Sequence, residues 1–393
     1  MLFLEPWFWT FAAAAVVGFL LLPQAIRIWW LLAASVVFYF HFGGVGGVLV
    51  VTILATLCWG AGLASTRIGR WSLPAFAICV CVATLVAYKY ANLLRDTLAR
   101  VALWTGTTPP VPLLNWMGPV APLGISFFTF EFVHYLYEVR VTGREPVRNP
   151  LHFAVFAFFF PTLAAGPIKR FPEFVPQLAT LPRPSADVFW GGVRRIIRGL
   201  FKKVCVADLL VEWVKLIEQQ SRPTSALVAA LAVLQGLRIY YDFDGYSDMA
   251  IGLAGTLGLS VPENFDRPYG ATSLRDFWRR WHMSLSSWIR DYVYVPLGGN
   301  RRHRAANLVI AMAICGLWHG AAWHFAAWGI YHGAGLAGET ALRRARPGLF
   351  DDGPFRNRVR QALCFGFVSY GWLLFFYPPR IVVQQTATLL RLA

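Results

Sequence analysis

The sequence predicts an all-α integral membrane protein, with about nine to twelve transmembrane helices plus re-entrant and interfacial helices. Of its 393 residues, 57% are apolar or aromatic and only 14% are charged, whereas a soluble domain usually carries about 25% charged residues. Apolar runs recur along the whole chain, which indicates many spans rather than one anchor. The net charge of +16 comes from basic clusters between these runs, a pattern typical of cytoplasmic loops and of contacts with anionic headgroups. We therefore expect a multi-pass protein that contacts the bilayer and no nucleic acid.

The spans are predicted from length, because about 17 to 25 apolar residues cross roughly 30 Å of hydrocarbon. In chain order the candidate segments are Trp7–Leu22, Ile26–Phe42, Val45–Ala64, Leu73–Tyr90, Leu123–Tyr137, Phe153–Ala165, Phe189–Leu210, Leu227–Tyr241, Met249–Leu259, Leu308–His332 as two segments, and Ala362–Tyr377. Several are too short for a full crossing, and their Gly and Pro residues predict broken or re-entrant helices packed inside the protein. Pro-rich stretches at Thr107–Pro112 and Leu181–Ser185 are predicted surface connectors. Glu5 and the lack of a basic leader favour a retained first helix over a cleaved signal peptide.

Composition divides the chain into three parts. Residues 1–118 are plain apolar helix and are predicted to form a scaffold. From Val120 onward, ionisable residues enter apolar stretches, and because such residues are costly in a membrane they are functional candidates. Residues 119–338 are therefore the predicted catalytic core, and residues 339–393 are predicted to form a C-terminal loop and helix.

Three histidines lie in a region without charged residues. The segment WHGAAWHFAAWGIYHG belongs to Ala305–Gly338, which contains no Asp, Glu, Lys or Arg. Burial disfavours the charged form of an imidazole, so we expect a neutral ring here, which is a competent general base for a hydroxyl. His319 is the best placed, because Gly320 lets a backbone or a substrate approach closely. For His324 and His332 the favoured alternative is hydrogen bonding between packed helices.

Neither a metal site nor a disulfide framework is predicted. His324 and His332 lie about 140° and 220° round a helix from His319, so one helix cannot bring all three together, and no HExxH motif is present. The six cysteines are scattered, mostly inside apolar runs, and none forms a CxxC pair. Packing is their predicted role. Cys315, one turn before His319, could form a Cys/His dyad, but apolar surroundings reduce the reactivity of a thiol.

Residues Asn264–Arg301 are dense in Arg and Trp around His282. If this segment is one helix, Trp278 and Arg279 lie one turn before His282 on its face, and Ser286 follows on the same face. Mixed Trp and Arg suit an interfacial amphipathic helix, and equally a funnel for an anionic carrier group or a polysaccharide. The closing PLGGN is predicted to be a turn. The candidate substrate-binding residues are Trp278, Arg279, Trp281, Ser286, Trp318 and Asp242.

Two groups of acidic residues lie in apolar sequence. The three aspartates of YYDFDGYSDMA lack the Gly and Glu spacing of a calcium loop. They are predicted to pair with arginines, because an unpaired carboxylate at depth is costly. Glu131, His134 and Glu138 are three and four residues apart, and their predicted role is a structural polar stripe inside the bundle.

Six blocks of the sequence resemble the membrane-bound O-acyltransferase family. They are PLGISFFTF from Pro122, FFPTLAAGPIKR from Phe159, YYDFDGYSDMAIGL from Tyr240, PENFDRPY from Pro262, DFWRRWHMSLSSWIRDYVYVPLGGNR from Asp276 and GLWHGAAWHFAAWGIYHG from Gly316. The blocks extend over Leu123–Gly333 and follow the family's order. The PLGGNR ending is similar to the bacterial branch that acetylates alginate, and the D-alanyl-lipoteichoic acid transferase belongs to the same branch.

The resemblance implies a function and a site. The family's essential histidine corresponds to His319 and a second functional histidine to His282, inside a ring of helices around a central tunnel. The implied reaction moves an acyl group, acetyl first, from a thioester donor on the cytoplasmic side to hydroxyls of an extracellular or periplasmic polysaccharide. The donor is acetyl-CoA or an acyl carrier protein, and no bound cofactor is expected. His319 is the predicted general base, and His282 assists by hydrogen bonding or by stabilising the oxyanion.

The resemblance also implies a bacterial inner-membrane location and a second acyltransferase outside the membrane that completes the transfer. Asp244 stands where the family more often has Ser, and Glu131 where Gln is common. The chain ends soon after Tyr377 and is shorter than alginate-type members, which leaves the partner and the acceptor open. Three alternatives remain: D-alanyl transfer to a teichoic acid-like polymer, a transporter or flippase that uses intramembrane polar residues, and a scaffold without catalysis. The lack of repeat halves disfavours the transporter.

Overall fold

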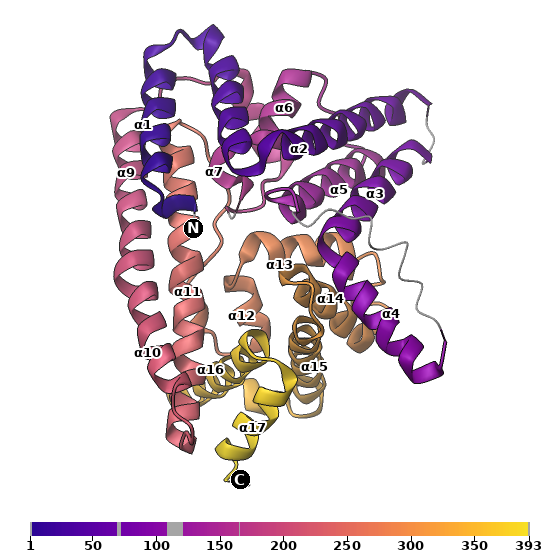
Figure 1. Cartoon of the computed structure of the whole chain (residues 1–393), viewed down its shortest axis with the longest axis vertical. Helices are drawn as coiled ribbons and strands as arrows, with labels where there is room; N and C mark the ends of the chain where they lie inside the picture. Colours follow the sequence, from indigo (N-terminus) through magenta and orange to yellow (C-terminus); the bar gives the residue numbers. More distant parts are fainter. Residues whose placement is uncertain (1, 69–71, 108–120, 165, 392–393) are drawn as a thin grey trace. The chain divides into compact units, whose positions relative to one another are not determined.

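The computed structural model describes residues 2–68, 72–107, 121–164 and 166–391, and these residues form helices, turns and loops without a β-strand (Figure 1). The predicted all-α fold class is confirmed. Contacts between residues divide the chain into an N-terminal unit, Met1–Ile197 with Asp248–Pro262, and a C-terminal unit, Arg198–Ser247 with Glu263–Ala393. Both His282 and His319 belong to the C-terminal unit. The three-part division at residues 118 and 338 stays a prediction.

The helices follow in chain order. Those that begin in the N-terminal unit are α1 (Pro6–Leu21), α2 (Gln24–Ile68), α3 (Ser72–Leu85), α4 (Ala91–Thr105), α5 (Ile125–Val141), α6 (Pro150–Phe158), α7 (Phe160–Leu163), α8 (Phe171–Phe174) and α9 (Ala186–Leu200). Those that begin in the C-terminal unit are α10 (Asp208–Glu218), α11 (Ser225–Thr256), α12 (Leu274–Arg280), α13 (Met283–Ile289), α14 (Arg304–His319), α15 (Trp323–Ala345), α16 (Pro354–Phe376) and α17 (Pro379–Leu389). The boundary between the units falls inside α9 and α11.

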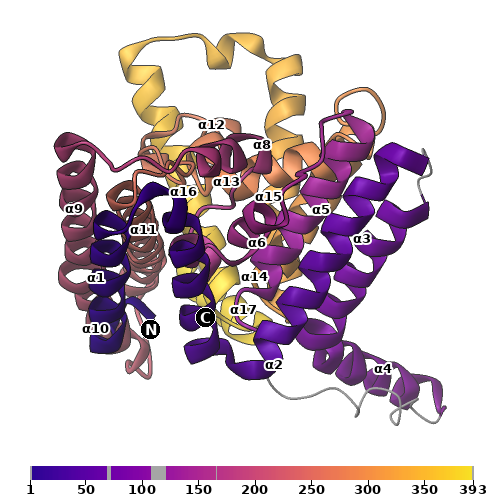
Figure 2. The same ribbon diagram turned by 90° about the horizontal axis from the view of Figure 1, so that it is seen from above.

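Several helices have the length and composition of membrane spans. In the described part of the chain four qualify, Gln24–Ser65, Ser72–Thr105, Ser225–Thr256 and Pro354–Phe376, and two shorter apolar helices, Pro6–Leu21 and Arg304–His319, accompany them. The kink in α2 lies at Gly44, whose φ of 64° and ψ of −178° interrupt the helix. That kink separates the two segments predicted at Ile26–Phe42 and Val45–Ala64. Helices α2, α3 and α5 pack side by side (Figure 2).

The prediction of broken helices is confirmed in the segment after α5. Phe159, with φ −48° and ψ 99°, ends α6 and starts the single turn α7. Residues 166–170, which precede α8, are not helical, and such backbone is tolerated at membrane depth only where other protein surrounds it. The connector Leu181–Ser185 is also non-helical, as predicted, whereas most of Thr107–Pro112 lies outside the described residues.

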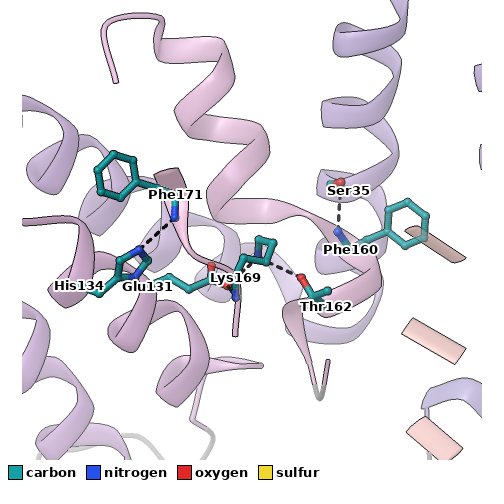
Figure 3. A network of polar contacts seen from close by, with 7 residues as sticks. All are labelled: Ser35, Glu131, His134, Phe160, Thr162, Lys169 and Phe171. Atoms are coloured by element: carbon teal, nitrogen blue, oxygen red, sulfur yellow. Dashed lines mark hydrogen bonds and ion pairs between the residues drawn. The ribbon is translucent and has the colours of Figure 1, made fainter. Parts of the chain in front are cut away.

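A buried ion pair holds this non-helical segment against α5 (Figure 3). Lys169 Nζ lies 2.6 Å from Glu131 Oε1, and both side chains are almost fully buried. The same Nζ donates to Thr162 Oγ1 at 3.0 Å, and the backbone N–H of Phe171 donates to His134 Nε2 at 3.1 Å. Glu131 and His134 therefore have the structural role predicted for them. Glu138 lies nearer the end of α5 and accepts from Thr142 and Arg144.

The prediction of separate spans at Leu227–Tyr241 and Met249–Leu259 is wrong, because α11 is one helix of 32 residues that contains the first segment and continues into the second as far as Thr256. Its aspartates are neutralised by basic side chains, so the helix continues without exposing unpaired carboxylates. The ion pairs are Lys203–Asp242 at 2.7 Å, Lys202–Asp244 at 2.6 Å and Arg195–Asp248 at 2.8 Å. Asp248 has the predicted arginine partner, and lysines pair with Asp242 and Asp244.

Helices α14 and α15 form an antiparallel pair whose backbones touch (Figure 1). Glycine makes this contact possible. A Cβ on Gly316 would collide with the backbone carbonyl of Phe325, a Cβ on Gly329 with the carbonyl of Met312, and a Cβ on Gly333 would lie 2.6 Å from the Cα of Val309. We call these three residues the glycine seam. The two helices also confirm the prediction that Leu308–His332 contains two segments.

The glycine seam gives a first testable prediction. Gly329→Ala is expected to lower the free energy of unfolding by about 1–3 kcal/mol, because neither backbone can move away without separating the helices. The measurement is an SDS titration of the protein in mixed micelles, followed by tryptophan fluorescence. Gly338→Ala is the matched control, since a Cβ there meets nothing within 4 Å and removing a glycine from a helix interior stabilises by about 0.5–1 kcal/mol. Equal stability of the two variants would contradict the prediction.

Candidate active site

His282 lies between two short helices rather than inside one. Helix α12 ends at Arg280, and His282, with φ 43° and ψ 57°, occupies the position before α13. The expectation that Trp278, Arg279 and Ser286 share one helical face with His282 is therefore wrong, because the left-handed backbone of His282 turns the chain. The closing segment after Val295 forms turns, as predicted, with Gly298 and Gly299 at positive φ.

A hydrogen-bond cluster surrounds His282, whose side chain is fully buried. Asn264 is also fully buried, and its Oδ1 lies 3.2 Å from His282 Nδ1 and 2.6 Å from Ser284 Oγ. Its Nδ2 donates to Ser247 Oγ at 3.0 Å, and its backbone carbonyl accepts from Met283 N at 2.8 Å. His282 lies in the connection between α12 and α13, outside the candidate membrane spans. Burial lowers its pKa well below the usual range, and the nearby charge of His319 lowers it further, so His282 is neutral at pH 7.

His319 ends α14 and lies next to an aromatic cluster. Its ring centroid is 5.0 Å from that of Trp318, 5.3 Å from Trp328 and 5.2 Å from Phe375. Trp318 also lies 5.6 Å from His282, so the same indole contacts both imidazoles. His319 is only half-buried, whereas His282 is fully buried. The close approach predicted at Gly320 is made by the ring of Phe325.

A cavity of about 500 Å³ lies beside the two histidines. Neither histidine lines it. Met283, which follows His282 in the chain, and Cys315, which lies one helical turn before His319, do line it. Its rim carries four arginines, which are Arg275, Arg279, Arg290 and Arg304. Its apolar wall comes mainly from α13 and α14. The cavity therefore combines positive charge at the rim with an apolar interior, which suits an anionic molecule with an extended apolar or weakly polar arm.

The predicted substrate-binding residues separate into two groups. Trp278, Arg279 and Ser286 line the cavity, and Trp318 lies between the histidines. Trp281 is buried against Phe277 and Trp372, and Asp242 is held by Lys203. The structure therefore places Trp281 in the aromatic core and Asp242 in an ion pair.

The remaining sequence candidates lie around the site. His332 is fully buried and contacts Trp278 and Trp328, but it makes no hydrogen bond to the described residues. Cys315 is buried, and no disulfide forms among the described cysteines. His324 lies against Phe325 with ring centroids 4.2 Å apart. Helix packing by hydrogen bonds, predicted for His332, is replaced by aromatic contacts.

Sequence reasoning did not select Asn264, Arg275, Arg290, Arg304 or Glu339. Glu339 accepts from the backbone N–H of Leu274 at 2.6 Å and so links α15 to the start of α12. Asn264 lies 18 residues before His282, with loops and helix α12 between them, and no local spacing rule connects two residues that far apart. The arginines were visible as basic clusters but not as one rim, because they come from α12, from the turn that follows α13, and from α14.

Comparison with known proteins gives the same family as the resemblance. Residues 146–378 match the family model described as MBOAT, membrane-bound O-acyltransferase family. The chain is 37% identical over 363 residues to the "Probable alginate O-acetylase AlgI" of Azotobacter vinelandii, covering 90% of the chain and 70% of that protein. It is 33% identical to the peptidoglycan O-acetyltransferase of Helicobacter pylori, covering 65% of the chain and 54% of that protein.

More distant relatives transfer a different group by name. The teichoic acid D-alanyltransferase of Bacillus subtilis is 31% identical, covering 58% of the chain and 62% of that protein. The chain thus spans little more than half to just over two thirds of the length of these relatives. The matches bear out the resemblance found in the six sequence blocks and the predicted enzyme class, an O-acyltransferase.

Proposed function

Because the chain belongs to the membrane-bound O-acyltransferase family, we propose that it moves an acetyl group from a cytoplasmic thioester donor across the membrane toward hydroxyls of an envelope polysaccharide. The observation that carries this proposal is the placement of two imidazoles against one indole, beside a cavity with an arginine rim. The relatives named for alginate and peptidoglycan acetylation favour acetyl over D-alanyl. The proposed location is the bacterial inner membrane, and residues 119–338 are the proposed catalytic core.

The proposed reaction needs one base and one activated carbonyl. His319 takes the proton of the acceptor hydroxyl, the hydroxyl oxygen bonds to the thioester carbonyl carbon, and the carbon–sulfur bond breaks. The departing sulfur then takes the proton from the His319 imidazolium, so the products are an ester and a free thiol. Holding the hydroxyl and the carbonyl next to the base removes much of the entropic barrier of bringing the three groups together.

The arginine rim suits the donor. Acetyl-CoA and acyl carrier proteins both present their thioester on a long arm that carries phosphate, and arginine binds phosphate with charge-assisted hydrogen bonds. An arm of this kind fits the charge at the rim and the apolar wall inside. We propose that the donor enters here, and that a second protein outside the membrane passes the acyl group to the glycan.

The rim gives a second prediction. Arg279, whose side chain is largely exposed, is expected to contribute about 1 kcal/mol to donor binding, so Arg279→Ala raises KM for acetyl-CoA about fivefold. The increase should shrink at high salt, because exposed charges are screened. Arg358→Ala on α16 is the control, since Arg358 is exposed and does not line the cavity. Equal KM values for both variants, at low and at high salt, would show that Arg279 does not contribute to donor binding.

Mass spectrometry of envelope glycans tests the proposed function directly. Glycans are compared from cells that carry the wild-type chain, His319→Ala, or no copy of the chain. The expected result is an acetyl ester with the wild-type chain only, with equal amounts of both proteins in the membrane. A D-alanyl mass would replace the proposed acyl group, and unchanged esters with His319→Ala would overturn the assignment of the base. Flux of a solute without any ester would identify a transporter.

A further inference from the structure

We propose that Asn264 is a positioning residue that holds His282 in the tautomer with its hydrogen on Nδ1, which leaves Nε2 as a bare hydrogen-bond acceptor. This inference rests on the proposed function, because His282 belongs to the proposed catalytic pair. It also decides between hydrogen bonding and oxyanion stabilisation, the two roles left open for His282. A bare Nε2 accepts a hydrogen bond and cannot donate one to an oxyanion.

The hydrogen-bond partners of the Asn264 amide lead to this tautomer. The amide nitrogen Nδ2 donates to Ser247 Oγ at 3.0 Å, and the amide oxygen Oδ1 receives the Ser284 hydroxyl at 2.6 Å. An amide oxygen can only accept. The nitrogen of His282 that lies 3.2 Å from Oδ1 is Nδ1, so Nδ1 donates. A neutral imidazole carries one hydrogen, and Nε2 therefore holds the lone pair.

Asn264 also holds the backbone of His282 in place. His282 has a positive φ of 43°, a conformation that costs a residue other than glycine about 1–3 kcal/mol unless its surroundings impose it. The Asn264 carbonyl accepts from Met283 N at 2.8 Å, directly after this residue. One buried asparagine thus fixes both the ring and the main chain of His282, which goes beyond what a packing residue needs to do.

The other ring nitrogen has no such partner. His282 Nε2 is buried and accepts no hydrogen bond from the described residues. Leaving a buried acceptor without a donor costs about 1–3 kcal/mol, and a substrate or a transient donor at Nε2 offsets this cost. The acceptor hydroxyl and the protonated His319 imidazole are the two donors that the proposed reaction brings to this place.

Nitrogen NMR tests the tautomer without relying on activity. The full-length protein, labelled with ¹⁵N-histidine and placed in nanodiscs, is compared with His282→Ala to assign the His282 signals. The wild-type protein is expected to show a protonated Nδ1 and an unprotonated Nε2. Asn264→Ala should give a mixture or the opposite tautomer, while Asn264→Asp, which keeps the oxygen, should preserve the Nδ1–H form. A wild-type spectrum with hydrogen on Nε2 overturns the inference, whatever the protein catalyses.

Kinetics test whether the position matters for transfer. Asn264→Ala is expected to lower kcat for ester formation about 10- to 100-fold with little change in KM for the donor, since Asn264 positions His282 and not the donor. Asn307→Ala is the matched control, because Asn307 is a buried asparagine whose amide donates to Gly299 and Arg302 carbonyls. Equal losses in both variants, per folded molecule, would make Asn264 merely structural and overturn the inference.

The pH profile adds a readout that a structural role would not move. The titratable group that acts on the charge of His282 is His319, which lies across Trp318 from it. A carboxylate introduced by Asn264→Asp stabilises the imidazolium and raises the pKa of His282. The acidic limb of the rate profile is therefore expected to move to higher pH by about one unit. An unshifted profile contradicts the inference. Loss of ester with the wild-type chain would instead count against the proposed function, and the NMR result would still decide the tautomer.

Discussion

His319→Ala is expected to lower the rate of ester formation by about 100- to 10,000-fold, the usual contribution of a positioned general base. Alanine leaves no group at the end of α14 that can accept the hydroxyl proton, while α14 itself stays packed through the glycine seam. KM for the donor should change little, because His319 does not line the cavity. The measurement is transfer from radiolabelled acetyl-CoA, or from an acetylated carrier protein, in membranes that contain equal amounts of each variant.

Two further variants separate catalysis from packing. His324→Ala is the control, because His324 lies on the neighbouring helix with its ring against Phe325, and we expect it to keep near wild-type rates. The double variant with His282→Ala should lose little more than His319→Ala alone, since residues that act as one catalytic unit are far from additive. Losses that multiply would show that the two histidines act independently.

Lys169→Met is expected to destabilise the protein by about 3–5 kcal/mol, because it leaves the Glu131 carboxylate buried without its partner. Lys169 Nζ lies 2.6 Å from Glu131 Oε1 with both side chains out of contact with solvent (Figure 3). Proton uptake by Glu131 would relieve part of this cost. The measurement is the SDS midpoint of unfolding in mixed micelles at pH 8, where an unpaired carboxylate is most unfavourable.

The controls for this prediction use the same unit of the chain. Glu131→Leu combined with Lys169→Met removes both charges, and the double variant is expected to recover most of the lost stability. Glu145→Gln breaks the exposed pair with Arg148, 3.8 Å apart, and should change stability by less than about 1 kcal/mol. A single Lys169→Met variant as stable as Glu145→Gln would show that the buried pair contributes nothing.

More of the fold than of the candidate site could be predicted from the sequence. Apolar runs locate the helices because membrane burial depends on local composition, and the break at Gly44 was visible as glycine between two runs. The error at α11 has a physical cause. In the sequence alone, three aspartates indicate an interruption between two membrane spans. In the folded protein, lysines from residues 201–207 neutralise two of these aspartates, so the helix continues.

The site was less accessible for a related reason. His319 and His282 were found through the family resemblance, since composition alone could not separate His319 from His324 and His332. No pattern along the chain indicated that Asn264 would meet His282, because the contact crosses 18 residues that include α12 and depends on the left-handed backbone of His282. The pairing of Glu131 with Lys169 was hidden in the same way, across 38 residues.

The glycine seam limits how far His319 can be displaced in the proposed active site. His319 sits on the last turn of a helix whose neighbour touches it through backbone atoms, and main-chain atoms have no rotamers with which to absorb an error. Proton transfer needs the two heavy atoms to lie about 2.6–3.2 Å apart. A shift of His319 by one carbon–carbon bond length is larger than the width of this range. Variation in the surrounding aromatic rings can be accommodated by repacking, whereas the smallest added side chain on Gly316 or Gly329 meets a backbone carbonyl of the other helix. The position of His319, the proposed base, thus depends on two residues that carry no methyl group.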